Sequence, residues 1–216
     1  MKFAIPGKRE KRRFRSGPTL TPEQMMERIL ALTVGWRYAA VSIGFPGSVI
    51  HGQPAAEPPN LGKGWVGFDF EQRFRKPVKI INDAAMQALG SYRDGRMLFV
   101  GLGTGLGSAF ILDDIVVPLE LGELTDSKGR KLGNVLGKRA LKKKGLPNWE
   151  KSLQDIIPHL VAAFRTDYLV IGGGSAKLVS KLPRGTQRGS NDLAFVGGER
   201  LWNSTIQHVK HTWVIA

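Results

Sequence analysis

Two segments of the sequence hold residue types whose spacing could support chemistry. In the first, glycine stands at every second position from residue 101 to residue 107. Glycine disfavours a strand interior, so we expect a turn whose backbone comes close to another group. Backbone N–H groups in such a turn can hold an anion such as phosphate, and Thr104 adds a hydroxyl donor. The prediction is a phosphate site at Gly103, Thr104, Gly105 and Gly107; the alternative is an ordinary hairpin turn.

The second segment contains Asp83, which follows the apolar run Val78–Ile81 and precedes the helix-forming run Ala84–Tyr92. A carboxylate at the start of a helix faces the positive end of the helix dipole, which favours its ionised form. An ionised carboxylate in that place can orient a hydroxyl group and accept its proton. The alternative is that Asn82 and Asp83 serve only as a helix cap.

A third glycine segment, formed by Gly172, Gly173 and Gly174, follows the apolar run Tyr168–Ile171. Ligands of α/β proteins bind beyond the carboxyl ends of strands, and a triple glycine there would let a nucleobase or phosphate lie against the backbone. A loop that enters a helix is the alternative. The sequence contains neither of the glycine-rich nucleotide motifs GxGxxG and GxxxxGK[ST], and its histidines show no metal-ligand spacing.

Strands alternating with helices must position these residues, which predicts an α/β protein. Further strands are expected within residues 1–15 and at 39–45, 97–102 and 108–112. Further helices are expected after the Thr21 capping box, near Glu71, at 149–164 and at 195–202. Residues 122–149 are expected to be basic and irregular.

Composition limits the possible functions. The chain has 216 residues, a net charge of +14 and no cysteine, which excludes disulfides, thiolate zinc sites and cysteine nucleophiles. Positive charge gathers in residues 8–15 and 128–144, as in a surface that binds polyanions; the alternative is a solvated surface. No apolar run is long enough for a membrane span, and the basic N-terminus lacks the apolar stretch of a secretory signal, so we expect a cytoplasmic protein with no membrane partner.

Six short motifs occur in an order typical of one family. They are Ile43–Gly47, Asn60–Leu61, Asn82–Ala84, Leu102–Ser108, Glu120–Gly122 and Ile171–Gly174. Together they resemble the ROK-type sugar kinases, most closely the polyphosphate glucokinase branch. The resemblance covers roughly residues 3–178, and it rests on the ordered set because each motif alone is weak.

The resemblance implies an actin-like ATPase, ribonuclease-H-like fold with two lobes, at residues 1–90 and 91–216, and a last helix that packs back on the first lobe. Asp83 would be the base on the 6-hydroxyl of a hexose, and the sugar hydroxyls would bind Asn60, Asn82 and Glu120. The turn at Thr104 would cradle the transferred phosphate. Gly172, Gly173 and Gly174 would face a nucleotide or the distal donor phosphates, with Mg²⁺ bridging donor oxygens.

Three departures from the family pattern stand out. Relatives begin with a strand and an Asp-x-Gly-Gly-Thr turn that forms the other half of the phosphate clamp, and no Asp-x-Gly-x-Thr occurs here. We expect its loss to leave unpaired strand edges and apolar faces, in a chain that is either incomplete or catalytically impaired. Glu123 stands where relatives usually have a histidine sugar ligand. The cysteine-rich zinc motif is missing, so no zinc is expected.

Three function hypotheses follow. The first is a kinase that transfers phosphate from polyphosphate or ATP to the 6-hydroxyl of glucose or a similar hexose. The second is a catalytically impaired relative that binds sugar or polyanion. The third, nucleic-acid binding, is suggested by the pI of about 10.3, but no helix-turn-helix segment accompanies it, so nucleic acid is not an expected partner. By analogy with the family, the protein is expected to form a homodimer.

Overall fold

The computed structural model describes residues 1–5, 8, 10–112, 115–203, 206–209 and 212–215. Its largest element is a seven-stranded mixed sheet with the order β11-β10-β7-β8-β9-β13-β12. The strands are β7 (Met97–Leu102), β8 (Leu106–Leu112), β9 (Ile115–Leu119), β10 (Tyr168–Gly172), β11 (Thr186–Arg188), β12 (Ile206–Val209) and β13 (Thr212–Ile215). Strands β7, β10 and β11 run parallel, whereas β7, β8 and β9 form an antiparallel meander.

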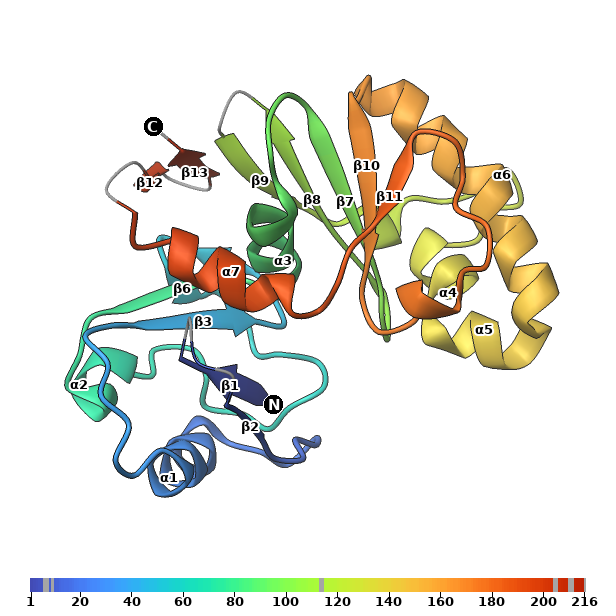
Figure 1. Cartoon of the computed structure of the whole chain (residues 1–216). Coiled ribbons are helices and arrows are strands. Elements are labelled where there is room, and N and C mark those ends of the chain that lie inside the picture. The colour runs from blue at the N-terminus through green and yellow to red at the C-terminus, as the bar shows by residue number, and fades with distance from the viewer. Residues whose placement is uncertain (6–7, 9, 113–114, 204–205, 210–211, 216) are drawn as a thin grey trace.

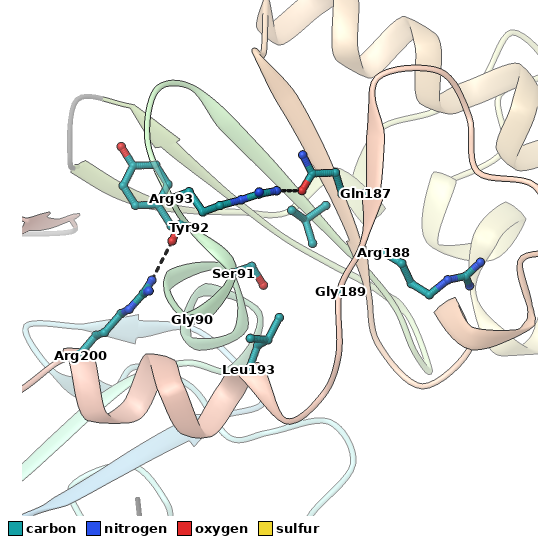
Figure 2. Close-up of a pocket in the computed structure, with 10 residues that line it drawn as sticks. Gly90, Ser91, Tyr92, Arg93, Gln187, Arg188, Gly189, Leu193 and Arg200 are labelled. Carbon is teal, nitrogen blue, oxygen red and sulfur yellow. Dashed lines mark hydrogen bonds between the residues drawn. The ribbon is translucent and has the colours of Figure 1, made fainter. Parts of the chain in front are cut away.

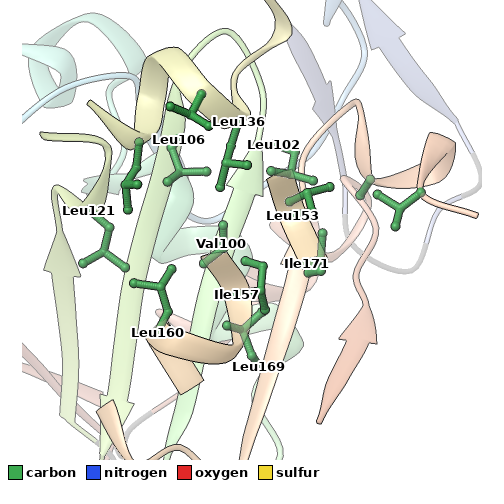
Figure 3. Packing of buried hydrophobic residues seen from close by; sticks show 14 of the residues in the cluster. Val100, Leu102, Leu106, Leu121, Leu136, Leu153, Ile157, Leu160, Leu169 and Ile171 are labelled. Atoms are coloured by element: carbon green, nitrogen blue, oxygen red, sulfur yellow. The ribbon is translucent and has the colours of Figure 1, made fainter. Parts of the chain in front are cut away.

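One face of this sheet is covered by α4 (Leu132–Leu136), α5 (Lys138–Lys144) and α6 (Leu146–Phe164) (Figure 1). Helix α6 faces the sheet with a stripe that includes Leu153, Ile157 and Leu160, at the spacing that puts residues on one side of a helix. Figure 3 shows these side chains packed against Val100 and Leu169 of the central strands. The core therefore holds the ends of β7 and β10 in fixed positions.

The opposite face is covered by α3 (Asp83–Ser91), whose alanines allow a close approach to the sheet (Figure 1). Gly107, in the first of the glycine-rich segments, also allows α3 to lie close to the sheet. A Cβ on Gly107 of β8 would lie 2.9 Å from the Cβ of Ala84. The start of α3 therefore lies directly against the β7–β8 hairpin.

The remaining N-terminal elements form three separate two-stranded sheets. These are β1 (Lys2–Ala4) with β2 (Lys11–Arg13), β3 (Val41–Phe45) with β6 (Val78–Asn82), and β4 (Val49–Ile50) with β5 (Gln53–Pro54). Helices α1 (Pro22–Leu32) and α2 (Phe70–Phe74) pack with β3 and β6 around the buried Trp65. The predicted capping box of α1 is confirmed, since Thr21 and Gln24 bond to each other's backbone N–H.

The expected unpaired strand edges are also present in this region. Among the described residues, β1 pairs with β2 alone and β3 pairs with β6 alone. Both strands line one cavity of about 600 Å³.

Helix α7 (Leu193–Arg200) crosses α3 at two glycines. A Cβ on Gly90 would lie 1.8 Å from the carbonyl oxygen of Leu193, and one on Gly197 would lie 1.9 Å from that of Met86. Arg200 then donates to the carbonyls of Leu89 and Tyr92 at the end of α3; Figure 2 shows Arg200 beside Tyr92. The two helices are in backbone contact, and a cation caps the negative end of α3.

The same helix also reaches the N-terminal elements. The Ser42 hydroxyl of β3 bonds to the carbonyl of Gly198, and Trp202 donates to that hydroxyl at 2.8 Å. Lys79 of β6 donates to the carbonyl of Leu201 at 2.6 Å. Helix α7 is thus joined to both α3 and the β3–β6 pair; the division at residue 90 stays a prediction.

One expectation about the fold was wrong. Residues 122–149 are not irregular, since they contain the short helices α4 and α5 and the start of α6. Gly137 separates α4 from α5, and Gly145 separates α5 from α6. Before them, Asp126 accepts from the backbone N–H of Lys128 and of Arg130, both at 2.9 Å, and from the Arg130 guanidinium. These hydrogen bonds and the Arg130 charge lower the pKa of Asp126 to about 2. No helix in the described part of the chain is long and apolar enough to cross a membrane.

Candidate active site

The cap of α3 is Asn82, which decides between the two interpretations of the neighbouring aspartate. Its Oδ1 accepts from the backbone N–H of Ala84 at 3.0 Å and of Ala85 at 3.1 Å. Its amide nitrogen donates to the carbonyl of Gly47 at 3.1 Å. Because Asn82 does the capping, Asp83 is the first residue of the helix, and its carboxylate is available for another role.

Asp83 lies on the wall of the 600 Å³ cavity. The residue is exposed at this wall, yet nearby protein removes part of its hydration, and this desolvation raises the pKa of its carboxyl. The Ala84 N–H opposes this rise, and the negative charge of Glu120 adds to it. The sequence suggested that the helix dipole would dominate; in the folded chain, desolvation outweighs it. A raised pKa suits a carboxylate that must take up a proton.

The glycine turn at residues 101–107 is the end of the β7–β8 hairpin. Gly101 pairs with Gly107 and Leu102 with Leu106, so residues 103–105 form the turn. The N–H of Gly103 is used inside the turn, where it lies 3.1 Å from the carbonyl oxygen of Gly101 and 3.2 Å from that of Gly105. Thr104 and Gly105 are exposed at the tip.

The glycines of this turn differ in what surrounds them. Nothing lies within 4 Å of a Cβ built on Gly103 or Gly105, whereas Gly107 is in close contact with α3. The turn is also held from the α5 side, because Lys138 donates its backbone N–H to the carbonyl of Gly103 at 2.9 Å. The turn is therefore both a hairpin and an open, supported backbone surface; phosphate binding there stays a prediction.

The second glycine segment lies beside the first. Gly172 of β10 pairs with Gly101 of β7, and the parallel strands end at the same edge of the sheet. Gly173 has φ +80, and a Cβ on it would lie 2.6 Å from backbone atoms of Leu102. The N–H of Ser175 donates to the Leu102 carbonyl at 3.0 Å. Glycine is required at position 173 for this backbone contact, which joins the two segments into one edge.

Glu120 is brought to the same place by a residue that the sequence analysis did not single out as a site. The buried hydroxyl of Ser108 donates to the carbonyl of Leu119 at 2.9 Å and accepts from the N–H of Leu121 at 3.0 Å. These bonds fix the backbone on both sides of Glu120. The sequence signal that could have pointed to Ser108 is a single hydroxyl in a strand of otherwise apolar or small residues, because a buried polar group normally has a hydrogen-bond partner.

Glu120 also has a raised pKa, caused first by burial and then by the charge of Glu123. Glu123 itself is exposed and forms an ion pair with Lys131, with the nitrogen and oxygen 2.5 Å apart. Asn60 is exposed in the loop between β5 and α2. The structure therefore brings Asp83, Glu120 and both glycine segments together. The catalytic role of Asp83 and the sugar-binding roles of Asn60, Asn82, Glu120 and Glu123 stay predictions.

A second cavity, of about 300 Å³, lies at the other end of α3 (Figure 2). It contains three arginines, but each already binds a neighbour. Arg200 caps α3, Arg93 donates to Gln187, and Arg188 donates to the carbonyls of Ala176 and Val179. This cavity offers no comparable set of catalytic groups. Within the described residues, no group of three or more histidine, aspartate or glutamate side chains could hold a metal ion.

Glycine segments at the ends of parallel strands, with an acidic helix start beside them, agree with the actin-like ATPase fold that the motifs predicted. The family model of the ROK family matches residues 6–118, and the chain belongs to the ROK family.

Two relatives show the same resemblance over most of the chain. A polyphosphate glucokinase from Mycobacterium tuberculosis is 26% identical over 185 residues, which cover 75% of this chain and 68% of that protein. The crystal structure of an inorganic polyphosphate/ATP-glucomannokinase from Arthrobacter sp. strain KM is 28% identical. It covers 82% of this chain and 81% of its own, with a TM-score of 0.67.

A second crystal structure supports the fold. The ROK family glucokinase from Streptomyces griseus, solved in complex with glucose and AMPPNP, covers 87% of this chain and 89% of its own, with a TM-score of 0.66 at 18% identity. Chains of low identity thus keep the same arrangement of strands and helices, and the fold class predicted from the motifs is confirmed.

Proposed function

We propose that this chain is a hexose kinase that transfers a phosphoryl group from polyphosphate or ATP to the 6-hydroxyl of glucose or a similar sugar. The observation that carries the proposal is the position of Asp83, a carboxylate with a raised pKa beside Glu120 and against the β7–β8 hairpin. Phosphoryl transfer depends mainly on positioning and on neutralising charge. One carboxylate on the sugar hydroxyl and a backbone edge on the phosphates meet those needs.

The proposed roles divide by location. Asp83 accepts the proton of the sugar 6-hydroxyl, and Glu120 accepts hydrogen bonds from other sugar hydroxyls, as do Asn60 and Glu123. Asn82 retains one N–H for the sugar, because its other amide bonds hold α3 and Gly47.

The phosphates are assigned to the glycine edge. Gly103, Thr104, Gly105 and Gly107 form the turn at the transferred group, and Gly172, Gly173 and Gly174 face the rest of the donor. Mg²⁺ is usually held by substrate phosphates and one or two carboxylates, and Asp83 would be such a carboxylate here. The ion would neutralise charge on the donor oxygens.

Polyphosphate is favoured as donor by the basic helix α5. Its first residue, Lys138, is bonded to the glycine turn through its backbone, and its exposed lysines and arginine continue away from the turn. The helix has no acidic residue. A long polyanion bound at the turn could therefore extend along α5.

We expect the double change Lys138→Gln and Lys142→Gln to raise KM for polyphosphate roughly tenfold, because each lost contact to a phosphate weakens polyanion binding. The two lysines are four residues apart and share one side of α5. The slope of log KM against log salt should fall by about two, while KM for glucose should change less than twofold. The matched control is Arg73→Gln with Lys76→Gln, near the end of β6 that lies away from Asp83; an equal rise there would contradict the assignment.

The pH dependence should report the pair of carboxylates. Asp83 must be ionised to act as a base, so kcat/KM should fall as pH drops through the pKa of Asp83, which is raised from the ordinary value of an aspartate. Glu120→Gln removes a neighbouring negative charge and should move this acid limb to lower pH. Glu123→Gln is the control, since Glu123 acts on Glu120 and not on Asp83. An unmoved limb in Glu120→Gln would exclude the coupling.

The activity itself is tested by following glucose 6-phosphate formation in a coupled assay, with polyphosphate and ATP supplied separately. Turnover that exceeds that of an Asp83→Ala variant supports the kinase. Turnover equal to that variant with both donors would overturn it. Sedimentation of the active protein would test the expected homodimer, and fractionation of its source cells would test the cytoplasmic location.

A second candidate function has its own supporting observation. The cavity between β1 and β3 reaches Asp83, so donor phosphates there would be held by the glycine edge on one side only. This arrangement favours a catalytically impaired protein that binds sugar or polyanion. Calorimetry that detects glucose binding without turnover would support this function, and normal turnover would exclude it.

A further inference from the structure

The loop between β5 and α2, residues 55–69, contains Asn60, and its beginning is attached to the start of α3. Asn82, the cap of α3, donates to the carbonyl of Gly47 at 3.1 Å. The carbonyl of the next residue, Ser48, accepts from the N–H of Ala55 at 3.0 Å. These two hydrogen bonds hold the beginning of the loop beside the start of α3.

The later part of the loop is held at the same place by an aromatic contact. Trp65 is 1% exposed, and the centroid of its ring lies 5.9 Å from that of Phe45. Phe45 is the last residue of β3 and pairs with Asn82. Just before Trp65, the N–H of Gly62 donates to the carbonyl of Leu20 at 2.9 Å. Both sides of the loop are therefore fixed near the residues that lead into α3.

The carboxylate of Glu57 joins these two sides of the loop. Its Oε1 accepts from the N–H of Gly64 at 3.0 Å, and its Oε2 accepts from the N–H of Trp65 at 3.2 Å. Desolvation favours the neutral carboxyl, but these N–H groups, with that of Val66 and the charge of Lys63, outweigh it and lower the pKa of Glu57. Glu57 therefore closes the loop as an ionised carboxylate with both of its oxygens.

Asn60 is exposed within the closed segment, and its neighbours limit the backbone there. Pro58 and Pro59 precede it, and proline fixes φ. Pro58 is buried, and its carbonyl accepts from the N–H of Leu61 at 3.4 Å. Leu61 packs, partly buried, against the cluster that contains Trp65. The backbone at residue 60 consequently has little freedom while the segment stays closed.

We propose that Glu57 is a positioning residue for the sugar: by closing the segment, it holds Asn60 where the Asn60 side chain meets a sugar hydroxyl. This inference rests on the proposed sugar-binding role of Asn60. Each carboxylate oxygen of Glu57 already accepts a backbone hydrogen bond, so Glu57 acts by holding the loop. A loop that is ordered in advance loses less conformational entropy when the sugar binds, and the affinity for glucose is higher than with an open loop.

Calorimetry with glucose and the whole chain measures this role without turnover. Glu57→Gln keeps one acceptor oxygen and Glu57→Ala keeps none, so the Kd for glucose should rise roughly threefold in the first and roughly tenfold in the second. The backbone N–H groups of Gly64 and Trp65 should exchange with solvent faster in the same order. The matched control is Glu71→Gln, because the exposed carboxylate of Glu71 accepts from the N–H of Val78 at 3.0 Å, outside the loop. It should leave the Kd unchanged.

A pair of substitutions separates positioning from a general effect on folding. If Glu57 acts through Asn60, Glu57→Gln adds nothing to the rise in Kd caused by Asn60→Ala, although it still speeds exchange at residues 64 and 65. If Glu57 contacts the sugar itself or acts through overall stability, the two effects on the Kd add. Additive effects would therefore overturn the proposal, as would an unchanged Kd in Glu57→Ala.

Kinetics give a second separation. In Glu57→Gln the KM for glucose should rise while kcat stays the same, because the substitution removes binding that the ground state and the transition state share. The KM for polyphosphate should not change. A chain that binds glucose without phosphorylating it fails the kinase assay alone, and the calorimetric test of Glu57 still applies. An unsubstituted chain that binds no glucose would overturn the role of Glu57 as well.

Discussion

Asp83→Asn is expected to lower kcat by about 10²–10⁴, because the amide keeps the shape of the side chain but cannot accept the proton of the sugar hydroxyl. Glucose binding, followed by calorimetry, should change little, since Glu120 and the asparagines remain. The matched control is Asp94→Asn, in the exposed turn between α3 and β7. A variant at position 83 that keeps more than a tenth of the original kcat would remove the base from the proposed mechanism.

The same substitution should make the protein more stable at pH 7. The folded state raises the pKa of Asp83 above its unfolded value, so folding favours the protonated form. The contribution to stability is present below the unfolded pKa and is lost as pH rises through the folded pKa. A neutral asparagine avoids that loss. Melting temperatures should therefore be higher for Asp83→Asn at pH 7, and the difference should shrink near pH 4.

Gly90→Ala is expected to lower the free energy of unfolding by about 3 kcal/mol. The added Cβ would overlap the carbonyl oxygen of Leu193, 1.8 Å away, and that backbone can move only if α7 separates from α3. For a chain of this length the change corresponds to a melting temperature roughly 6–12 °C lower. Thermal unfolding followed by circular dichroism measures it.

The direction of the stability change in Gly90→Ala distinguishes a helix in contact with a neighbour from one without. In a helix with no neighbour at that position, glycine to alanine stabilises by about 1 kcal/mol. An increase in melting temperature would therefore show that α3 and α7 do not cross at Gly90. Gly17→Ala is the control, because nothing lies within 4 Å of its Cβ and its φ is not positive; it should be neutral or slightly stabilising. Gly197→Ala should act at the same contact, so its effect combined with Gly90→Ala should not be additive.

Much of the local structure could be predicted from the sequence because the signals are local. The Thr21 capping box, the strand before Asp83 and the hairpin at residues 101–107 each depend on residues within one short segment. The order of six such segments was enough to identify the family. The basic segment after residue 122 was misjudged because α4 and α5 have only five and seven residues, too few for a helical period to show in the sequence.

The sequence by itself determined the family, the fold class and which carboxylate lies at the start of a helix. Only the tertiary structure decided that Asn82 caps that helix, that Glu120 lies close enough to act on Asp83, and that Ser108 fixes Glu120 in place. It also decided the direction of the Asp83 pKa, against the expectation from the helix dipole. The physical reason is that hydration and charge at one group depend on atoms far away in the chain, and only folding brings those atoms together.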